Sequence, residues 1–263
     1  MVNSKQRRET YRGLWVLMLV FLAGAAAQAQ QSYVGRYDAY AGFADLESPA
    51  LGLNQTGYHF QVGMNMRSWM AMGFDYTNAD GTMILTPSEL PAGPQQQEIY
   101  GYINACVPGG TGIPPSPGNP GCLPGSLPAG YQLRVSTDSF LQEFAMGPVF
   151  NYRHFSRVTL FTHPSLGAFR IRATPHGTDP FALGVVYALT SGTGTKLDWT
   201  GFYGGALGMD YNVTKHLALR AQWDMVYQHP FNDILANGFW TERYSFGPNF
   251  QFGRNILSPH AKK

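Results

Sequence analysis

The sequence has 263 residues, of which 44% are hydrophobic and only 13% are charged, and its formal net charge is +2. A charge so close to zero gives no reason to expect a nucleic-acid partner. After residue 29 no apolar run is long enough to cross a bilayer as a helix, which argues against a helical membrane protein. The aromatic content of 14% and the 31 glycines are instead typical of closely packed strands with aromatic girdles.

The first 29 residues have the three parts of a secretory signal peptide. A basic segment between residues 5 and 12 precedes an apolar run over residues 14–27, and Ala27-Gln28-Ala29 provides a small-x-small cleavage site. The apolar run is shorter than the roughly 18 residues of a transmembrane helix, so cleavage after Ala29 is expected rather than a retained anchor. The sequence therefore predicts export of a mature chain that begins at residue 30.

Residues 36–44 form the first alternating segment, and the clearest alternation follows within residues 57–78. There, large apolar residues such as Phe60 and Phe74 occupy every second position, with small, amide or charged residues between them. Successive side chains of a strand point to opposite faces, so this stretch predicts two strands joined by a tight turn. One apolar and one polar face suit a wall between lipid and a polar interior.

The same alternation predicts five further strands, which makes eight in total. They lie at residues 139–153, 158–170, 200–212, 216–227 and 243–253. The pattern is least regular in the second of these, where Pro164 suggests a bulge. Each segment is about as long as the roughly 9–11 residues that a tilted transmembrane strand needs.

Short and long connections alternate along the predicted strands. Three tight turns, at residues 67–69, 154–156 and 213–215, are interleaved with long connections at residues 45–56, 79–138, 171–199 and 228–242. Short periplasmic turns and longer external loops are typical of an up-and-down barrel with both termini in the periplasm. The sequence thus predicts an all-β, eight-stranded antiparallel transmembrane barrel over residues 30–253, with a tail at residues 254–263. A soluble lipocalin-like barrel, with its large residues inside, is the alternative fold.

The only two cysteines, Cys106 and Cys122, lie in the Pro- and Gly-rich part of the second long connection. In an exported protein they predict a disulfide that closes the loop, with a stabilisation on the order of 3 kcal/mol. Neither has a neighbour at zinc-ligand spacing, so no metal site is expected. This connection is too rich in Pro and Gly for regular structure to be expected. An apolar run at residues 182–189 of the next long connection either extends the flanking strands or forms a small hairpin.

Three segments resemble the small eight-stranded outer-membrane barrels of the OmpA-like and opacity-type porin families: residues 37–43, residues 205–220 and residues 246–253. The resemblance implies an integral protein of a Gram-negative-type outer membrane, a monomer in contact with outer-membrane lipid and lipopolysaccharide. Its long loops would be open to an external ligand. In those families the last strand commonly ends the chain at an aromatic residue, whereas eleven residues follow Phe252 here. This difference concerns the route of assembly rather than the fold.

With the apolar face outside, charged side chains occupy the interior and need partners, because an isolated buried charge costs several kcal/mol. The predicted lumen charge network consists of Asp38, His59, Arg67, Asp75, Glu143, Arg153, Asp210, Arg220, Asp224 and Arg243. An eight-stranded lumen is just wide enough for side chains, so the network predicts a plugged barrel with a structural or surface-interaction role. A narrow small-solute channel, gated by an arginine–carboxylate pair, is the alternative function.

His163 and Ser165 are the candidates for nucleophilic catalysis, because they share one face of a predicted strand and the imidazole could activate the hydroxyl. Their spacing resembles the His-x-Ser arrangement of outer-membrane lipid A deacylases, which gives a second alternative function. No orienting acid or set of oxyanion donors is evident beside them. The sequence therefore predicts a protein that is not an enzyme and that needs no cofactor.

Overall fold

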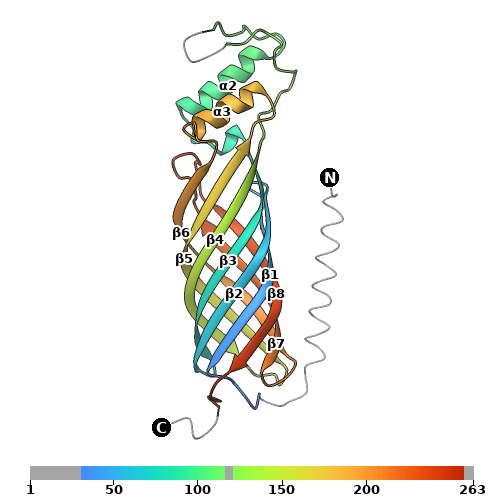
Figure 1. Cartoon of the computed structure of the whole chain (residues 1–263), viewed down its shortest axis with the longest axis vertical. Helices are drawn as coiled ribbons and strands as arrows, with labels where there is room; N and C mark the ends of the chain where they lie inside the picture. Colours follow the sequence, from blue (N-terminus) through green and yellow to red (C-terminus); the bar gives the residue numbers. More distant parts are fainter. Residues whose placement is uncertain (1–30, 116–120, 258–263) are drawn as a thin grey trace.

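The computed structural model describes residues 31–115 and 121–257, so the predicted signal peptide and the tail beyond residue 257 lie outside the described residues. Within the described part, eight antiparallel strands close into one barrel (Figure 1). Each strand pairs with its neighbour in the chain, and the first pairs with the last. The predicted eight-stranded up-and-down barrel is confirmed. None of the described helices is both long and apolar enough to span a membrane.

The strand bounds place short connections at one end of the barrel and long ones at the other. The strands are β1 (Tyr37–Ser48), β2 (Leu53–Arg67), β3 (Met70–Leu85), β4 (Val135–Tyr152), β5 (Val158–His176), β6 (Lys196–Asn212), β7 (Leu217–Gln228) and β8 (Phe239–Phe252). The turns after β2, β4 and β6 lie at the same end as both described chain termini, where Val34 N donates to Asn255 Oδ1 at 3.0 Å (Figure 1). We call this the turn end and the opposite end the loop end.

The outer face of the barrel has a continuous zone of exposed apolar side chains, which we call the outer belt. It includes Phe43, Phe60, Val62, Phe74, Phe144, Leu166, Leu207 and Phe246. Aromatic residues border it, with Trp69 and Tyr152 toward the turn end and a contacting group of Tyr203, Tyr227 and Trp240 toward the loop end. The predicted alternation thus gives the barrel an apolar outside over this zone.

At the loop end, every strand continues beyond its predicted bound, β3 and β5 furthest. β5 ends at His176 rather than at residue 170, with its ladder to β4 intact. The period of two persists in this extension, but the two faces exchange polarity: Arg172 points outward and Ile171 is buried inside. The prediction followed an apolar outer face, so it stopped where that face becomes polar.

The second and third long connections contain helices that the sequence was not expected to form. They are the 3-10 helix η1 (Pro87–Glu89), α2 (Pro94–Cys106) and α3 (Pro180–Leu189). The interpretation of residues 182–189 as a hairpin or strand extension is therefore wrong. Asp179 caps α3, because its Oδ1 accepts hydrogen bonds from the backbone N–H groups of Phe181 and Ala182 at 3.0 and 2.9 Å. Pro180 is the first helical residue, a position whose N–H has no partner within a helix, so proline costs no hydrogen bond there.

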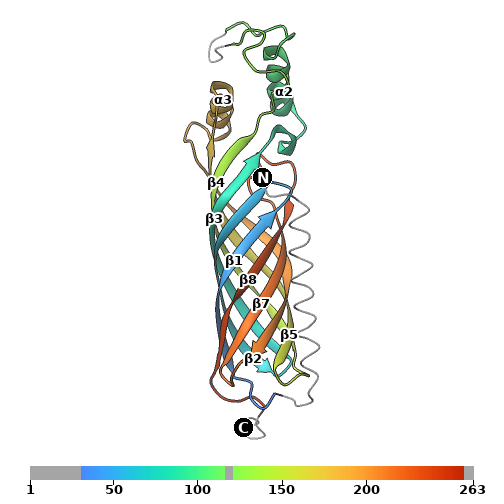
Figure 2. The ribbon, with the colours of Figure 1, turned by 90° about the vertical axis from the view of Figure 1, so that its right-hand side faces the viewer.

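The helices α2 and α3 pack together above the loop end (Figure 2). We call the unit that consists of η1, α2, α3 and the disulfide between Cys106 and Cys122 the crown. Tyr102 stacks on Phe181 with ring centroids 4.5 Å apart. Cys106, the last residue of α2, is joined to Cys122 with a Cα–Cα distance of 5.7 Å, as expected for a disulfide. The expectation that the second connection lacks regular structure is wrong for α2.

The register shift of the strands lies in β2 rather than at Pro164, but the β4–β5 ladder has a gap at Pro164, between the pairs Met146↔Leu166 and Phe150↔Thr162. The β5–β6 register passes through the pair Pro164↔Gly205 without a shift. In β2 the register to β3 shifts between Asn65 and Arg67, so Arg67 pairs with Met70. One extra residue in β2 reverses which of the following side chains point inward and which point outward.

Candidate functional site

The interior of the barrel has two layers of different chemistry. Toward the turn end, most inward side chains are polar or charged, and they include the predicted network apart from Arg67, beside a small apolar cluster of Ala71, Val149 and Phe161. Toward the loop end they form an apolar cluster with the residues of the long connections: Ala44, Leu46, Leu53, Ala79, Met83, Leu141, Phe169, Ile171, Phe202, Val226, Phe231, Leu235 and Phe239. The sequence analysis expected a polar interior throughout and missed this apolar layer.

Arg220 of β7 is buried in the polar layer and faces Asp210, its cross-strand partner on β6. Its Nε and Nη2 donate to the two oxygens of Asp210 at 2.7 and 2.9 Å. Its Nη1 donates to Gln61 Oε1 of β2. The guanidinium carbon also lies 4.5 Å from the ring centroid of Phe161. The bidentate pair fixes the two neighbouring side chains, and the contact with Gln61 crosses the lumen from β7 to β2.

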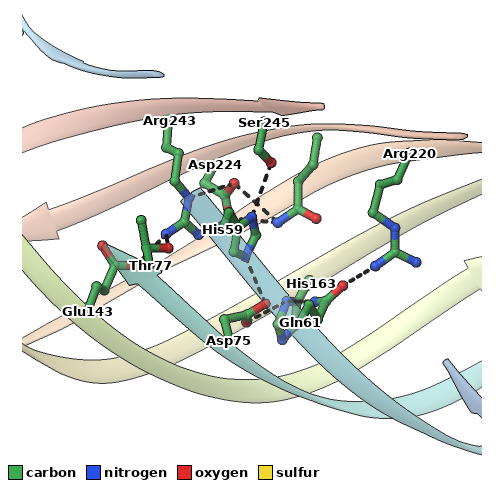
Figure 3. Close-up of polar contacts among 11 residues, drawn as sticks. His59, Gln61, Asp75, Thr77, Glu143, His163, Arg220, Asp224, Arg243 and Ser245 are labelled. Atoms are coloured by element: carbon green, nitrogen blue, oxygen red, sulfur yellow. Dashed lines mark hydrogen bonds and ion pairs between the residues drawn. The ribbon is translucent and has the colours of Figure 1, made fainter. Parts of the chain in front are cut away.

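Arg243 of β8 forms a second bidentate pair and contacts side chains from three other strands (Figure 3). Its Nε and Nη2 donate to the oxygens of Asp224 at 3.2 and 2.8 Å. Its Nη1 donates to Glu143 Oε1 at 2.8 Å and also to Thr77 Oγ1. Glu143 comes from β4 and Thr77 from β3, strands that pair with neither β7 nor β8, so this contact crosses the lumen.

Asp75 of β3 lies between two buried imidazoles (Figure 3). Its Oδ1 is 3.1 Å from His59 Nε2, and its Oδ2 is 3.3 Å from His163 Nδ1. His163 Nδ1 is also 3.1 Å from Gln61 Nε2. A protonated Nδ1 donates to Asp75, and an unprotonated one accepts from Gln61. Ser245 Oγ, 3.1 Å from His59 Nδ1, completes this chain of contacts.

Asp38 and Arg153 lie at the turn end of the interior and meet through Asn65. Asn65 Nδ2 donates to Asp38 Oδ2 at 3.0 Å, and Arg153 Nη2 donates to Asn65 Oδ1 at 3.3 Å. Arg153 Nε also donates to the carbonyl oxygen of Ser68 at 2.9 Å. Arg67 is exposed, so its assignment to the network is corrected. The register shift in β2 turns its side chain to the face of its partner Met70.

Neutral groups that the sequence analysis did not single out hold the charged ones together. They are Gln61, Asn65, Thr77, Gln222, Ser245 and Asn249. Each alternates in phase with the charged residues of its strand, which is the pattern that could have identified it. A cavity of about 10 Å³, lined in part by Asp38, Gln61 and Arg220, leaves room for about one water. Around this cavity the charged and amide side chains fill the polar layer.

The structure does not build a nucleophile from His163 and Ser165. His163 is 1% exposed and contacts Asp75 and Gln61 inside the barrel. Ser165 pairs with Gly204 in the β5–β6 ladder. Within residues 31–115 and 121–257, no hydrogen bond joins the His163 ring to the Ser165 hydroxyl. An imidazole enclosed in this way has no route to a lipid substrate.

The closed antiparallel ladder and the filled interior define the class of fold, a small up-and-down β-barrel. Neither a protein-family model nor a curated protein sequence matches the chain. Among solved structures, it is similar to Neisserial surface protein A (NspA), with 14% identity and a TM-score of 0.47 over 82% of this chain and 96% of that one.

The chain is also similar to Ail, the attachment invasion locus protein of Yersinia pestis, with 11% identity and a TM-score of 0.44 over 83% of this chain and 99% of that one. A further similarity is to the outer membrane protein OprG from Pseudomonas aeruginosa, with 8% identity and a TM-score of 0.43 over 86% and 99% of the two chains. These proteins are small outer-membrane barrels, the class that the sequence resembles. At such identities the likeness is one of architecture alone.

Proposed function

We propose that this chain is an integral outer-membrane barrel, exported by a cleaved signal peptide, whose lumen is closed and whose role is structural or surface-interacting. The observation that carries the proposal is the pairing of an apolar outer belt with a charged, filled interior at the same height. In water, Phe60 and Phe74 would lie inside and Arg220 outside. The opposite arrangement is stable where lipid surrounds the wall.

Two features support a closed lumen over a small-solute channel. Arg220 and Arg243 each have a bidentate carboxylate partner, and Arg243 also reaches Glu143 on the far wall. Separating such a buried pair costs about 3–5 kcal/mol for each uncompensated charge. The apolar layer above the pairs would also have to be wetted before a solute could pass.

The crown supports a surface role. α3 has no charged residue, and Leu183 and Tyr187, one helical turn apart, are 55% and 69% exposed. Tyr100 on α2 and Leu123 beside the disulfide are exposed as well. Exposed apolar residues on a disulfide-closed unit are suited to contact with a partner outside the cell.

Planar-bilayer conductance of the mature chain, refolded in detergent with its disulfide intact, tests the closed lumen. We expect no discrete conductance steps from protein that is folded and inserted. Reproducible steps would replace the plugged barrel with the small-solute channel. Extraction of membranes with carbonate tests the location separately: the protein should stay in the membrane pellet, and release into the wash would refute the outer-membrane assignment.

A further inference from the structure

Two arginines on the outside of the barrel face the region where a lipid headgroup would lie. Resting on the proposed outer-membrane location, we propose that Arg170 and Arg172 of β5 bind the phosphate groups of a lipid A-type glycolipid in the outer leaflet. Neither residue belongs to the lumen network. The inference concerns the outer wall and is independent of whether the lumen conducts.

The first argument is their height on the wall. On β5 the outer face is apolar up to Leu166 and Ala168, and it becomes polar at Arg170. The inner face changes in the opposite sense at the same level, where Phe169 is fully buried in the apolar layer. On β5 this exchange of polarity marks the edge of the lipid, because an apolar residue is favoured outside only where lipid covers it. Across the ladder from Arg172, Leu197 of β6 is still 50% exposed, so this edge combines apolar and basic side chains.

The second argument is the neighbouring aromatic residue. Arg170 pairs across the ladder with Trp199 of β6, which is 58% exposed on the outer face. Tryptophan is enriched at the level of the lipid headgroups. Toward the turn end, Leu166 and Tyr203 are 65% and 59% exposed side by side. Acyl chains lying on them would place their headgroup beside the two arginines.

The third argument is that the guanidinium groups lack a carboxylate partner. In the described part of the chain, no ion pair joins Arg170 or Arg172 to an acid. Arg170 Nη1 donates only to Gln142 Oε1, at 3.4 Å, and the Arg172 guanidinium carbon lies 5.5 Å from the ring centroid of Phe140.

The carboxylates nearest in the ladder form no ion pair with the two arginines. Asp138 of β4 is 2.8 Å from His176 Nε2. Asp80 of β3 is separated from Arg172 by Phe140, which pairs with both residues. The outward acids Asp45, Glu47 and Glu242 are on β1 and β8, away from β5 in the strand order. The positive charge is therefore confined to one side of the wall.

The geometry suits phosphate. Residues two apart on a strand share a face and lie roughly 6.6 Å apart along it. A guanidinium presents two parallel N–H donors that match two oxygens of a phosphate. Two such groups, already oriented by Gln142 and Phe140, can hold one or two phosphates at the lipid surface.

The test compares Arg170→Gln/Arg172→Gln with Arg157→Gln, since Arg157 is an exposed arginine at the turn end. Refolded proteins in detergent are titrated with lipid A, with the same lipid A after removal of its phosphates, and with inorganic phosphate, and tryptophan fluorescence reports binding. We expect the double variant to bind lipid A at least about tenfold more weakly than the wild type, and Arg157→Gln to bind like the wild type. The wild type should bind the dephosphorylated lipid as weakly as the double variant binds lipid A.

Equal lipid A affinity of the double variant and the wild type would overturn the proposal. So would equal binding of the phosphorylated and dephosphorylated lipids, or inorganic phosphate that competes fully with lipid A. Circular dichroism and heat-dependent gel mobility establish that both variants fold. A folded wild type that is released by carbonate would instead refute the membrane location, so the two failures are distinguishable.

Discussion

Replacing Arg243 with methionine would leave Asp224 and Glu143 as buried carboxylates without a counter-charge. Arg243 donates two hydrogen bonds to Asp224 and one to Glu143, and each of the three side chains is at most 4% exposed. Removing one partner of a buried pair costs about 3–5 kcal/mol. Because one arginine serves two carboxylates, we expect the free energy of unfolding to fall by about 4 kcal/mol or more.

Urea unfolding of the refolded barrel in lipid vesicles, followed by tryptophan fluorescence, measures this loss. The control combines Arg243→Met with Asp224→Asn and Glu143→Gln, which removes all three charges. Uncharged groups in place of a buried ion network are often nearly neutral in stability, so the triple variant should recover at least half of the loss. A loss below about 1 kcal/mol in the single variant, or an equal loss in both, would refute the coupling of these charges.

Three further changes address the outer belt and the crown. Leu166→Arg should lower the stability of the barrel in lipid vesicles by about 2–4 kcal/mol, measured by the same unfolding, and an unchanged stability would contradict lipid contact at this height. Cys106→Ser/Cys122→Ser should speed proteolysis of the crown, seen by mass spectrometry, while the strands stay protected. Asp179→Ala should weaken the α3 cap by about 1 kcal/mol and speed hydrogen exchange of that helix. The same substitution should lower the pKa of Tyr131, which burial and its hydrogen bond to Asp179 raise, so phenolate absorbance should appear at lower pH than in the wild type, with Tyr131→Phe as the control.

The number and order of the strands could be predicted because residues 57–78 and their equivalents keep one apolar face without interruption. The inward positions of Glu143, Arg220 and Arg243 follow from the same period. Their partners could not be predicted, because the contact of Arg243 with Glu143 joins strands that are not neighbours in the ladder. Local alternation fixes the face of a residue but not its height relative to a distant strand.

The wrong predictions for Arg67, for residues 182–189 and for the barrel interior have local causes. Arg67 follows a one-residue shift in β2 that has no mark in composition, so counting by twos placed it inside. The α3 helix was hidden because an uncharged apolar run of this length fits a strand or a buried helix equally well. Asp179 before Pro180 was the cue that distinguishes them, since it is a cap followed by a first helical residue. The apolar inner layer was missed because most of its residues, such as Leu46, Met83 and Ile171, lie beyond the predicted strand bounds.

The length of the strands determines the distance between the crown and the outer belt. β5 has 19 residues, which at a rise of ~3.3 Å and a tilt near 40° gives a vertical span of roughly 48 Å. The apolar band of an outer-membrane barrel is only about 25 Å tall. The strands therefore extend about 20 Å beyond the apolar band. This extension is hydrogen-bonded between strands and filled by the apolar layer, so it supports the crown as a folded structure rather than as a flexible linker. If lipid surrounds the outer belt as proposed, this extension holds α2 and α3 above the bilayer surface.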